Sequence, residues 1–239
     1  GTLLQYFTGS KEHNILLRER ARRMGLSLSD LNITRLTDGV EETYAREEEV
    51  YARLGLAWIP PELREDGGEV EAAEQGTLPA LVEGRDIRGD LHVHTDWSDG
   101  DSPLEVMVEQ AARRGYAYVA ITDHSVGRGI ARGLSVERLR QQRGLIQEAR
   151  RRHPGLAILH GSEVDIRGDG SLDYPDEVLG WLDFVIGSIH SGMQQGREQM
   201  TARILRAMEN PYLTVIGHLT GRLLGEREPI DVDVEAVLQ

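Results

Sequence analysis

The chain has 239 residues, and its 40 Asp and Glu outnumber its 27 Lys and Arg, so the net charge is −13. This excess of negative charge argues against a broad nucleic-acid surface, so any contact with nucleic acid must be local. The sequence contains no cysteine, which excludes disulfides and thiolate ligands and leaves His, Asp and Glu to hold any metal. No apolar run approaches the roughly 20 residues that span a bilayer, and the start has no signal-peptide pattern, so we expect a cytoplasmic protein without a membrane partner.

The first 60 residues predict a small α+β segment. Residues 1–7 have the pattern of a strand, and Gly9-Ser10 begins a helix to about Met24 that Gly25 can cap. An acidic amphipathic helix is expected over residues 41–54, ended by the prolines at 60 and 61. The basic side chains of the first helix either contact phosphate or lie on a solvated face, and both readings stay open; they are Arg18, Arg20, Arg22 and Arg23.

Residues 61–86 are rich in Glu and Gly and have little apolar periodicity, so we expect a linker there. Since the chain opens at Gly1 in what has the pattern of the middle of an element, we also expect a fragment of a longer protein. After the linker, residues 87–239 alternate short apolar runs with helical stretches. The runs are 91–94, 118–122, 156–160, 184–189 and 213–216, and the helices 104–114, 136–152, 177–181, 199–209 and 232–238. This alternation predicts an α/β domain with parallel strands, either a barrel or an open sheet.

The stretch from Arg88 to Gly100 begins with a period of two. In an extended segment Leu91 and Val93 point to one face, while His92 and His94 point together to the other. One face can then pack, and the other can hold a metal. Asp99, in the turn after this strand, offers a carboxylate beside the two imidazoles.

Every later strand of this domain also ends on, or runs directly into, a residue type that binds metals. These residues are His124 (preceded by Asp123), Glu163, His190 and His218. In a parallel barrel the strand C-termini lie on one face, so side chains distant in sequence converge there. A single such histidine is more often structural, but the recurrence at five strand ends predicts a metal centre. Because this set exceeds the needs of one ion, we expect two or three ions bridged by a carboxylate, with Glu163 as the bridge.

Nitrogen ligands mixed with carboxylates favour Zn, Mn or Fe over Mg or Ca, and such clusters suit phosphoester hydrolysis. Asp123 is expected to fix a neighbouring group rather than bind metal. The glycine-rich loop of residues 125–133 carries Arg128 and Arg132, which either grip a substrate phosphate or lie exposed. Arg222, just after His218, is a further phosphate-binding candidate.

These motifs resemble those of the PHP family of metal-dependent phosphoesterases: His92-x-His94 with Asp99, then Thr122-Asp123-His124, then Glu163, His190 and His218. The resemblance implies a distorted (βα)7 barrel with a trinuclear site. It places His92, His94 and Glu163 on the first ion, Glu163, His190 and His218 on the second, and Asp99 with His124 on the third. It also implies catalytic roles for His92, His94, Glu163 and His190.

The chain further resembles the C-terminal portion of bacterial family X DNA polymerases, in which a PHP domain follows a core similar to DNA polymerase beta. Tyr6-Phe7-Thr8-Gly9-Ser10 and Asn14 look like the end of that core, and the resemblance implies that Tyr6, Phe7, Gly9 and Asn14 line a deoxynucleotide pocket. Residues 169–175 and 218–224 also look typical of these enzymes. Leu219 stands where the family usually has proline, and the last Asp-x-His ligand pair would lie beyond Gln239. Because the family's closed barrel needs seven strands and five apolar runs are present, we expect an incomplete barrel.

The resemblance implies part of a DNA-repair polymerase whose PHP domain acts as a metal-dependent 3′-5′ exonuclease on primer/template DNA and its 3′ ends. Mn or Zn would occupy the PHP site, and Mg would serve polymerase carboxylates outside this chain. Two alternatives remain: a PHP phosphatase for a small phosphomonoester, and a non-catalytic PHP domain that positions DNA or stabilises the polymerase core. The oligomeric state is not predicted.

Overall fold

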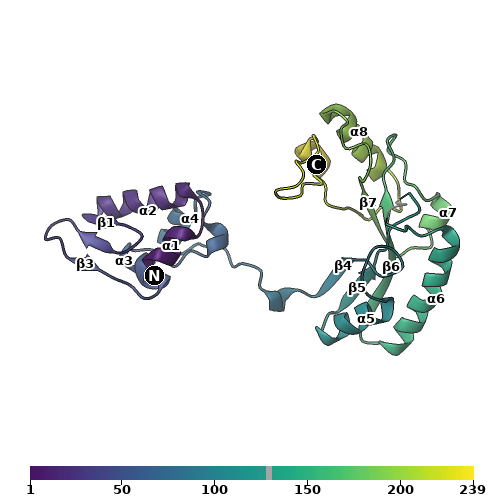
Figure 1. Ribbon diagram of the computed structural model, residues 1–239, viewed down its shortest axis with the longest axis horizontal. Coiled ribbons are helices and arrows are strands. Elements are labelled where there is room, and N and C mark those ends of the chain that lie inside the picture. The colour runs from purple at the N-terminus through teal and green to yellow at the C-terminus, as the bar shows by residue number, and fades with distance from the viewer. Residues whose placement is uncertain (128–130) are drawn as a thin grey trace. The chain divides into compact units, whose positions relative to one another are not determined.

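The computed structural model describes residues 1–127 and 131–239. The chain divides into two compact units, Gly1–Val82 and Glu83–Gln239, and each is described by itself (Figure 1). No helix in the described ranges is both long and apolar enough to cross a membrane.

The first unit contains three short antiparallel strands and four α-helices. The strands are β1 (Leu26–Leu28), β2 (Ile33–Arg35) and β3 (Glu41–Glu42), in the order β1-β2-β3. The helices are α1 (Thr2–Phe7), α2 (Lys11–Arg23), α3 (Glu47–Arg53) and α4 (Glu69–Gln75), with a 3-10 turn, η1, at Pro61–Leu63. The core between them is formed by side chains such as Leu17, Ile33, Val50, Leu54 and Ile59, all fully buried.

Helix α2 confirms the helix predicted after Gly9-Ser10. The Ser10 hydroxyl accepts a hydrogen bond from the His13 amide (3.1 Å), and Gly25 beyond its end has φ +72°. The strand predicted for residues 1–7 is wrong, because this segment is α1. Its two buried side chains, Thr2 and Gln5, are three residues apart, which is a helical spacing.

Two other predictions for this unit need correction. The helix expected over residues 41–54 covers only Glu47–Arg53, because Glu41–Glu42 pair with β2 instead. The stretch expected as a linker, residues 61–86, contains η1, α4 and a second 3-10 turn, η2 (Gly84–Asp86). Val70 and Ala73 of α4 are buried in the core of the first unit, so this part of the stretch is folded rather than a bare connection.

The second unit confirms the predicted parallel strands. They are β4 (Gly89–Val93), β5 (Tyr118–Ile121), β6 (Ala157–Asp165), β7 (Phe184–Ser188) and β8 (Val215–Ile216), in the order β4-β5-β6-β7-β8. The connections contain α5 (Leu104–Arg113), α6 (Val136–Arg152), α7 (Asp176–Leu179) and α8 (Arg197–Met208), and α9 (Val234–Leu238) follows β8. This is a five-stranded half-barrel of the expected α/β class, so the barrel is incomplete in the described residues, as the sequence predicts.

Strand β6 is the longest, and its two neighbours cover different parts of it. β5 pairs with residues Ala157–His160, whereas β7 pairs with Gly161–Asp165. The second half of β6 therefore extends past the end of β5. Glu163, in that half, meets the segment that follows β5 through an isolated bridge to His124.

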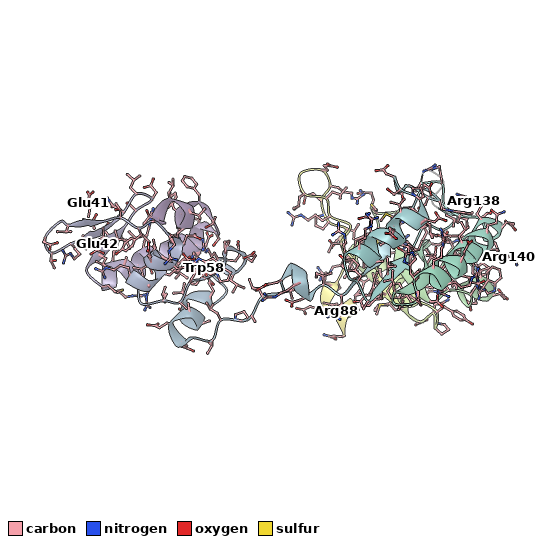
Figure 2. All side chains as sticks on the ribbon, turned by 90° about the horizontal axis from the view of Figure 1, so that it is seen from below. Glu41, Glu42, Trp58, Arg88, Arg138 and Arg140 are labelled. Carbon is pink, nitrogen blue, oxygen red and sulfur yellow. The ribbon has the colours of Figure 1, made fainter. Side chains whose placement is uncertain are left out.

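Apolar clusters on the sheet hold this arrangement. Ala120 of β5 and Phe184 and Ile186 of β7 form one small cluster, with Leu159 of the intervening β6 packed against it. A second cluster joins β5 and β6 to α5 and α6. Arg138 and Arg140 of α6, labelled in Figure 2, contact aromatic side chains: Arg138 lies 5.7 Å from the ring centroid of Trp97, and Arg140 lies 4.6 Å from that of Trp181. Arg138 also donates hydrogen bonds to the backbone oxygens of Trp97 and Arg132.

Candidate metal centre

Two histidines from the end of β4 face the same carboxylate. The Nε2 atoms of His92 and His94 each lie 3.3 Å from Oε2 of Glu163, and the two rings are 5.1 Å apart. The register between β4 and β5 shifts between Asp90 and Val93, so this strand end is irregular. The two imidazoles nevertheless reach one point, as the period of two predicts.

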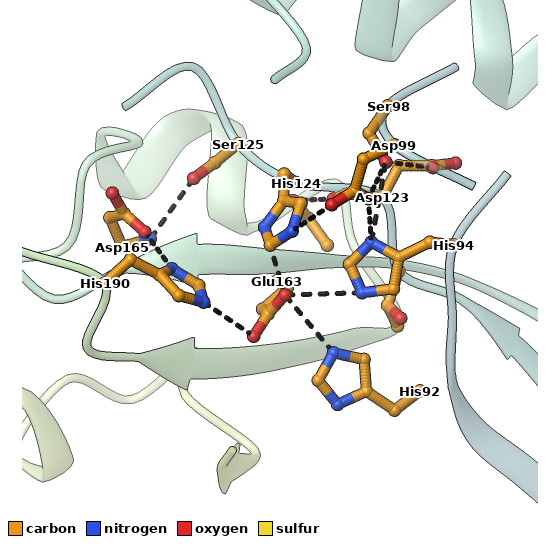
Figure 3. A network of polar contacts seen from close by, with 12 residues as sticks. His92, His94, Ser98, Asp99, Asp123, His124, Ser125, Glu163, Asp165 and His190 are labelled. Carbon is orange, nitrogen blue, oxygen red and sulfur yellow. Dashed lines mark hydrogen bonds and ion pairs between the residues drawn. The ribbon is translucent and has the colours of Figure 1, made fainter. Parts of the chain in front are cut away.

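Glu163 lies at the middle of the group, with a side chain only 2% exposed (Figure 3). Its Oε2 faces His92, His94 and the Nδ1 of His124, the last at 3.0 Å. Its Oε1 faces His190 Nε2 at 3.3 Å and His218 Nε2 at 2.8 Å. The two oxygens of one carboxylate thus face two different sets of histidines, which is the arrangement of a bridging ligand.

Asp99 joins a third group with His94 and His124. Its Oδ1 lies 3.2 Å from His94 Nδ1, and its Oδ2 lies 3.3 Å from His124 Nε2. Three sets of ligand atoms each lie close enough to share an ion: His92-His94-Glu163, His94-Asp99-His124 and His124-Glu163-His190. The structure therefore brings all seven sequence-predicted metal residues together, and all of them except Asp99 line a pocket of about 340 Å³.

The charges of the centre are coupled through Glu163. Although burial opposes its ionisation, hydrogen bonds from histidines hold the pKa of Glu163 well below its usual range. Burial disfavours the charged form of His190, but hydrogen bonds to Asp165 and Glu163 outweigh it and raise its pKa to about 9. His94 has a pKa raised by Glu163 against the effect of burial, whereas burial lowers the pKa of His124. The carboxylate therefore stays ionised and draws positive charge toward itself.

The donor set fits divalent transition ions. Imidazole nitrogens and hard carboxylates suit Zn, Mn or Fe, and thiolates are absent from the sequence. His124 Nδ1 is buried and has no hydrogen-bond partner among the described residues, although it lies 3.0 Å from Glu163 Oε2. A buried ring nitrogen without a hydrogen bond is costly unless something else takes its lone pair, and an ion would do so.

Asp123 holds neighbouring residues of the centre in place, which is the role that the sequence predicts for it. Its Oδ1 accepts hydrogen bonds from the Thr95 amide (2.7 Å) and the Ser98 hydroxyl (2.5 Å). Its Oδ2 accepts from the Thr95 hydroxyl (2.7 Å) and from Gln142 Nε2 (2.6 Å). Three of these bonds fix the turn between His94 and Asp99, and the fourth ties Asp123 to α6.

Sequence reasoning missed a second supporting carboxylate. Asp165 Oδ1 lies 2.5 Å from His190 Nδ1, and the Asp165 amide donates to Asp173 Oδ1 at 3.1 Å. A signal for it exists, because Asp165 lies two residues after Glu163 in the same strand and therefore on the same face. Asp173 lies in the segment 169–175, whose resemblance to the family X enzymes assigns no role to this side chain.

Arginines flank the mouth of the pocket. Arg222 and Arg227 line it together with the ligands, and Arg227 Nε donates to the Gly221 carbonyl at 2.7 Å. Arg132, in the predicted phosphate loop, is exposed with φ +55°. Arg128 of that loop lies outside the described residues.

The predicted nucleotide residues meet at the turn between α1 and α2. Asn14 Nδ2 donates to the backbone oxygens of Tyr6 (3.2 Å) and Ser10 (3.1 Å). Phe7 is 72% exposed and packs edge-on against Tyr6, and the Arg18 guanidinium lies 5.2 Å from the Tyr6 ring centroid. Gly9 has φ +90°, and a Cβ there would lie 2.3 Å from Arg64 Cβ, so only glycine fits. Of the basic residues of α2, Arg20 is bound to the Leu54 carbonyl and to Glu74.

Comparison with known families matches both units. Residues 3–65 match the DNA polymerase beta thumb, and residues 90–232 match the PHP domain. The two matches together cover the turn at Gly9 and every candidate ligand of the metal centre.

Among curated proteins, the DNA polymerase/3′-5′ exonuclease PolX of Bacillus subtilis (strain 168) is 41% identical over 238 residues. The alignment covers 100% of this chain and 41% of that protein, so the chain spans about two fifths of that relative's length. A probable phosphatase of Caldanaerobacter subterraneus is 30% identical over 63% of this chain and 56% of its own length. A probable phosphatase of Clostridium novyi (strain NT) is 43% identical over 27% of this chain and 28% of its own length.

Among solved structures, histidinol phosphate phosphatase of Lactococcus lactis, crystallised with zinc, L-histidinol and phosphate, has a TM-score of 0.39 at 17% identity. That alignment covers 56% of this chain and 58% of that structure.

Proposed function

Because the chain belongs to the PHP family, and its polymerase beta thumb followed by a PHP domain places it with the bacterial family X DNA polymerases, we propose that its PHP domain is a metal-dependent 3′-5′ exonuclease. The proposed setting is DNA repair, in the cytoplasm. The observation that carries the proposal is Glu163, a buried carboxylate whose two oxygens face two sets of histidines. That geometry suits a cluster of ions around one phosphodiester.

Each ligand has a defined place in the proposed cluster. His92 and His94 would hold one ion with Oε2 of Glu163, and His190 and His218 a second with Oε1. Asp99 and His124 would hold a third. Bound Mn or Zn would lower the pKa of water and neutralise charge on the phosphate. His92, His94, Glu163 and His190 are the residues we propose as catalytic.

Substrate binding would rest on local cations, since the chain as a whole is acidic. Arg222 and Arg227 line the pocket beside the ligands, where guanidinium groups can contact phosphate oxygens in pairs. In the first unit Tyr6, Phe7, Gly9 and Asn14 would face a deoxynucleotide of the primer/template complex. Mg-binding carboxylates for polymerisation would lie outside this chain.

A phosphatase for a small phosphomonoester is the second candidate. The observation that favours it is the 30% identity to a probable phosphatase over 63% of this chain. Against it stands the thumb, residues 3–65, which a small phosphomonoester would not require.

The test compares DNA and a monoester with the same protein. Wild-type protein loaded with Mn or Zn is incubated with 5′-labelled and 3′-labelled DNA and, separately, with p-nitrophenyl phosphate. We expect products shortened from the 3′ end, with loss of this activity in the His92→Ala and His94→Ala variants. His153→Ala is the matched control, because His153 Nε2 lies 4.0 Å from Glu109 Oε2 and outside the centre.

Three outcomes would contradict the proposal. Hydrolysis of the monoester alone would identify a phosphatase. Binding of DNA without hydrolysis of either substrate would identify a non-catalytic domain. Undiminished DNA digestion by the His92→Ala variant would place the nuclease elsewhere.

A further inference from the structure

One histidine of the metal centre has its tautomer fixed by a neighbouring acid. His190 Nδ1 lies 2.5 Å from Asp165 Oδ1, so Nδ1 carries the proton and donates it to the carboxylate. The lone pair of the neutral ring is then on Nε2, which faces Glu163 Oε1 at 3.3 Å. Among the described residues, His190 is the one histidine of the centre whose second nitrogen contacts a carboxylate outside the predicted ligand set.

Asp165 is itself held in place by a buried network (Figure 3). Its amide donates to Asp173 Oδ1 (3.1 Å) and to the Ser125 hydroxyl (3.2 Å). Asp173, 6% exposed, also accepts from the Ser125 hydroxyl and from the Gly127 amide, both at 2.7 Å. A Cβ on Gly127 would lie 2.8 Å from Asp173 Oδ2 and 3.1 Å from Asp165 Oδ2, so the backbone at Gly127 packs directly against both carboxylates.

We propose that Asp165 is a positioning residue that makes Nε2 of His190 a metal ligand. Asp173 and Ser125 hold Asp165 in place by accepting hydrogen bonds from its amide. The inference rests on the proposed function, because it assigns a role within the same metal centre. A carboxylate behind a ligating histidine fixes the ring and raises its basicity. Asp165 should therefore act on the ion at the Oε1 side of Glu163, which His190 and His218 share, and leave the ion of His92 and His94 unchanged.

Metal binding tests this directly. Zn is titrated against a competing chelator into wild-type protein and into the Asp165→Asn variant, which keeps the shape of the side chain and removes its charge. We expect one of the bound ions to weaken by about 10- to 100-fold and the others to keep their affinity. Asp169→Asn is the matched control, because Asp169 is exposed and hydrogen-bonds Ser171 alone among the described residues; it should bind zinc as wild type does.

A double-mutant cycle separates positioning from a general structural effect. If Asp165 acts through His190, adding Asp165→Asn to His190→Ala should cause no further loss of zinc affinity. A further loss of 10-fold or more in that background would overturn the inference. A ¹⁵N-histidine NMR spectrum of zinc-loaded wild-type protein provides a second measurement that needs no variant: we expect the His190 proton on Nδ1, and a proton on Nε2 alone would also overturn the inference.

The outcomes distinguish the two proposals. A wild-type protein that binds neither Zn nor Mn refutes the proposed metal centre and the role of Asp165 together. Normal zinc binding in wild type with unchanged affinities in Asp165→Asn refutes the role of Asp165 alone. If zinc binds the Asp165→Asn variant more weakly and the wild-type protein has no nuclease activity, the role of Asp165 is supported and the proposed reaction is refuted.

Discussion

Arg64 is fully buried in the first unit, and its replacement should destabilise that unit strongly. Its Nη1 lies 2.8 Å from Glu47 Oε1, its Nε donates to the Ile59 carbonyl at 2.9 Å, and its guanidinium lies 5.2 Å from the Tyr51 ring centroid. Arg64→Met leaves Glu47, 8% exposed, as an unpaired buried charge. Breaking a buried pair in this way costs about 3–5 kcal/mol.

The unpaired charge predicts a specific pattern of stabilities. For a slope of about 2 kcal/mol per molar urea, the Arg64→Met variant should unfold at a midpoint about 2 M lower than wild type. Adding Glu47→Gln removes the stranded charge and should restore a large part of the loss. Arg46→Met is the control, because Arg46 is 70% exposed and its pair with Glu49 at 3.8 Å should contribute less than about 0.5 kcal/mol.

Tryptophan fluorescence can follow the first unit alone. Trp58 belongs to that unit, and the other two tryptophans, Trp97 and Trp181, belong to the second, so they are replaced by Phe in all samples. A midpoint within 0.3 M of wild type for Arg64→Met, by the same slope of about 2 kcal/mol per molar, would refute the argument from the buried charge. A double variant less stable than Arg64→Met would refute it as well.

Three further predictions concern the second unit. Glu163→Gln should reduce the rise in melting temperature that zinc causes, because the two ions that share this carboxylate would bind more weakly. In wild type each bound ion should add about 2.7 kcal/mol at 100 times its Kd, and an equal rise in both proteins would show that Glu163 is not a shared ligand. Burial lowers the pKa of His160 to about 4, so the unfolded state binds its proton first, and about 3 kcal/mol of stability should be lost as the pH falls from 6.5 to 4. Urea unfolding across that range should show a shallower pH dependence in His160→Leu, and identical slopes would contradict this cause. Gly161→Ala should lower the unfolding free energy by about 1–3 kcal/mol, because its Cβ would lie 2.7 Å from the Phe184 carbonyl; a stability equal to wild type would contradict the clash.

The second unit was largely predictable because its strands carry their own signals. The apolar runs of β5, β6 and β7 are largely buried, and residue types that bind metals recur where the strands end. One pattern therefore predicts both the fold class and the meeting of these side chains at one place. Asp165 was harder to predict: the period of two places it on the same face as Glu163, but its single hydrogen bond to His190, 25 residues away, follows no spacing rule.

The first unit was predicted less well, since its elements depend on contacts distant in sequence. β1 and β2 have three residues each and β3 has two, too few to show a period, and pairing between strands defines them. Helix α4 has two buried apolar side chains, Val70 and Ala73, in a stretch dominated by Glu and Gly. The Thr8-Gly9-Ser10 turn depends on Arg64, whose carbonyl accepts from the Ser10 amide at 2.7 Å.

The stagger of β6 between its two neighbours has a consequence for how this domain tolerates change in length. Deleting one residue from the part of β6 paired with β5 would rotate Glu163 to the opposite face of the sheet, and all five imidazoles would lose their common acceptor at once. Loops on the far side of the sheet, such as the one between α5 and β5, bear no ligand and could gain residues at little cost. In an insertion scan we therefore expect a one-residue change within β6 to abolish zinc binding, and insertions in the helix-to-strand loops to leave zinc binding intact.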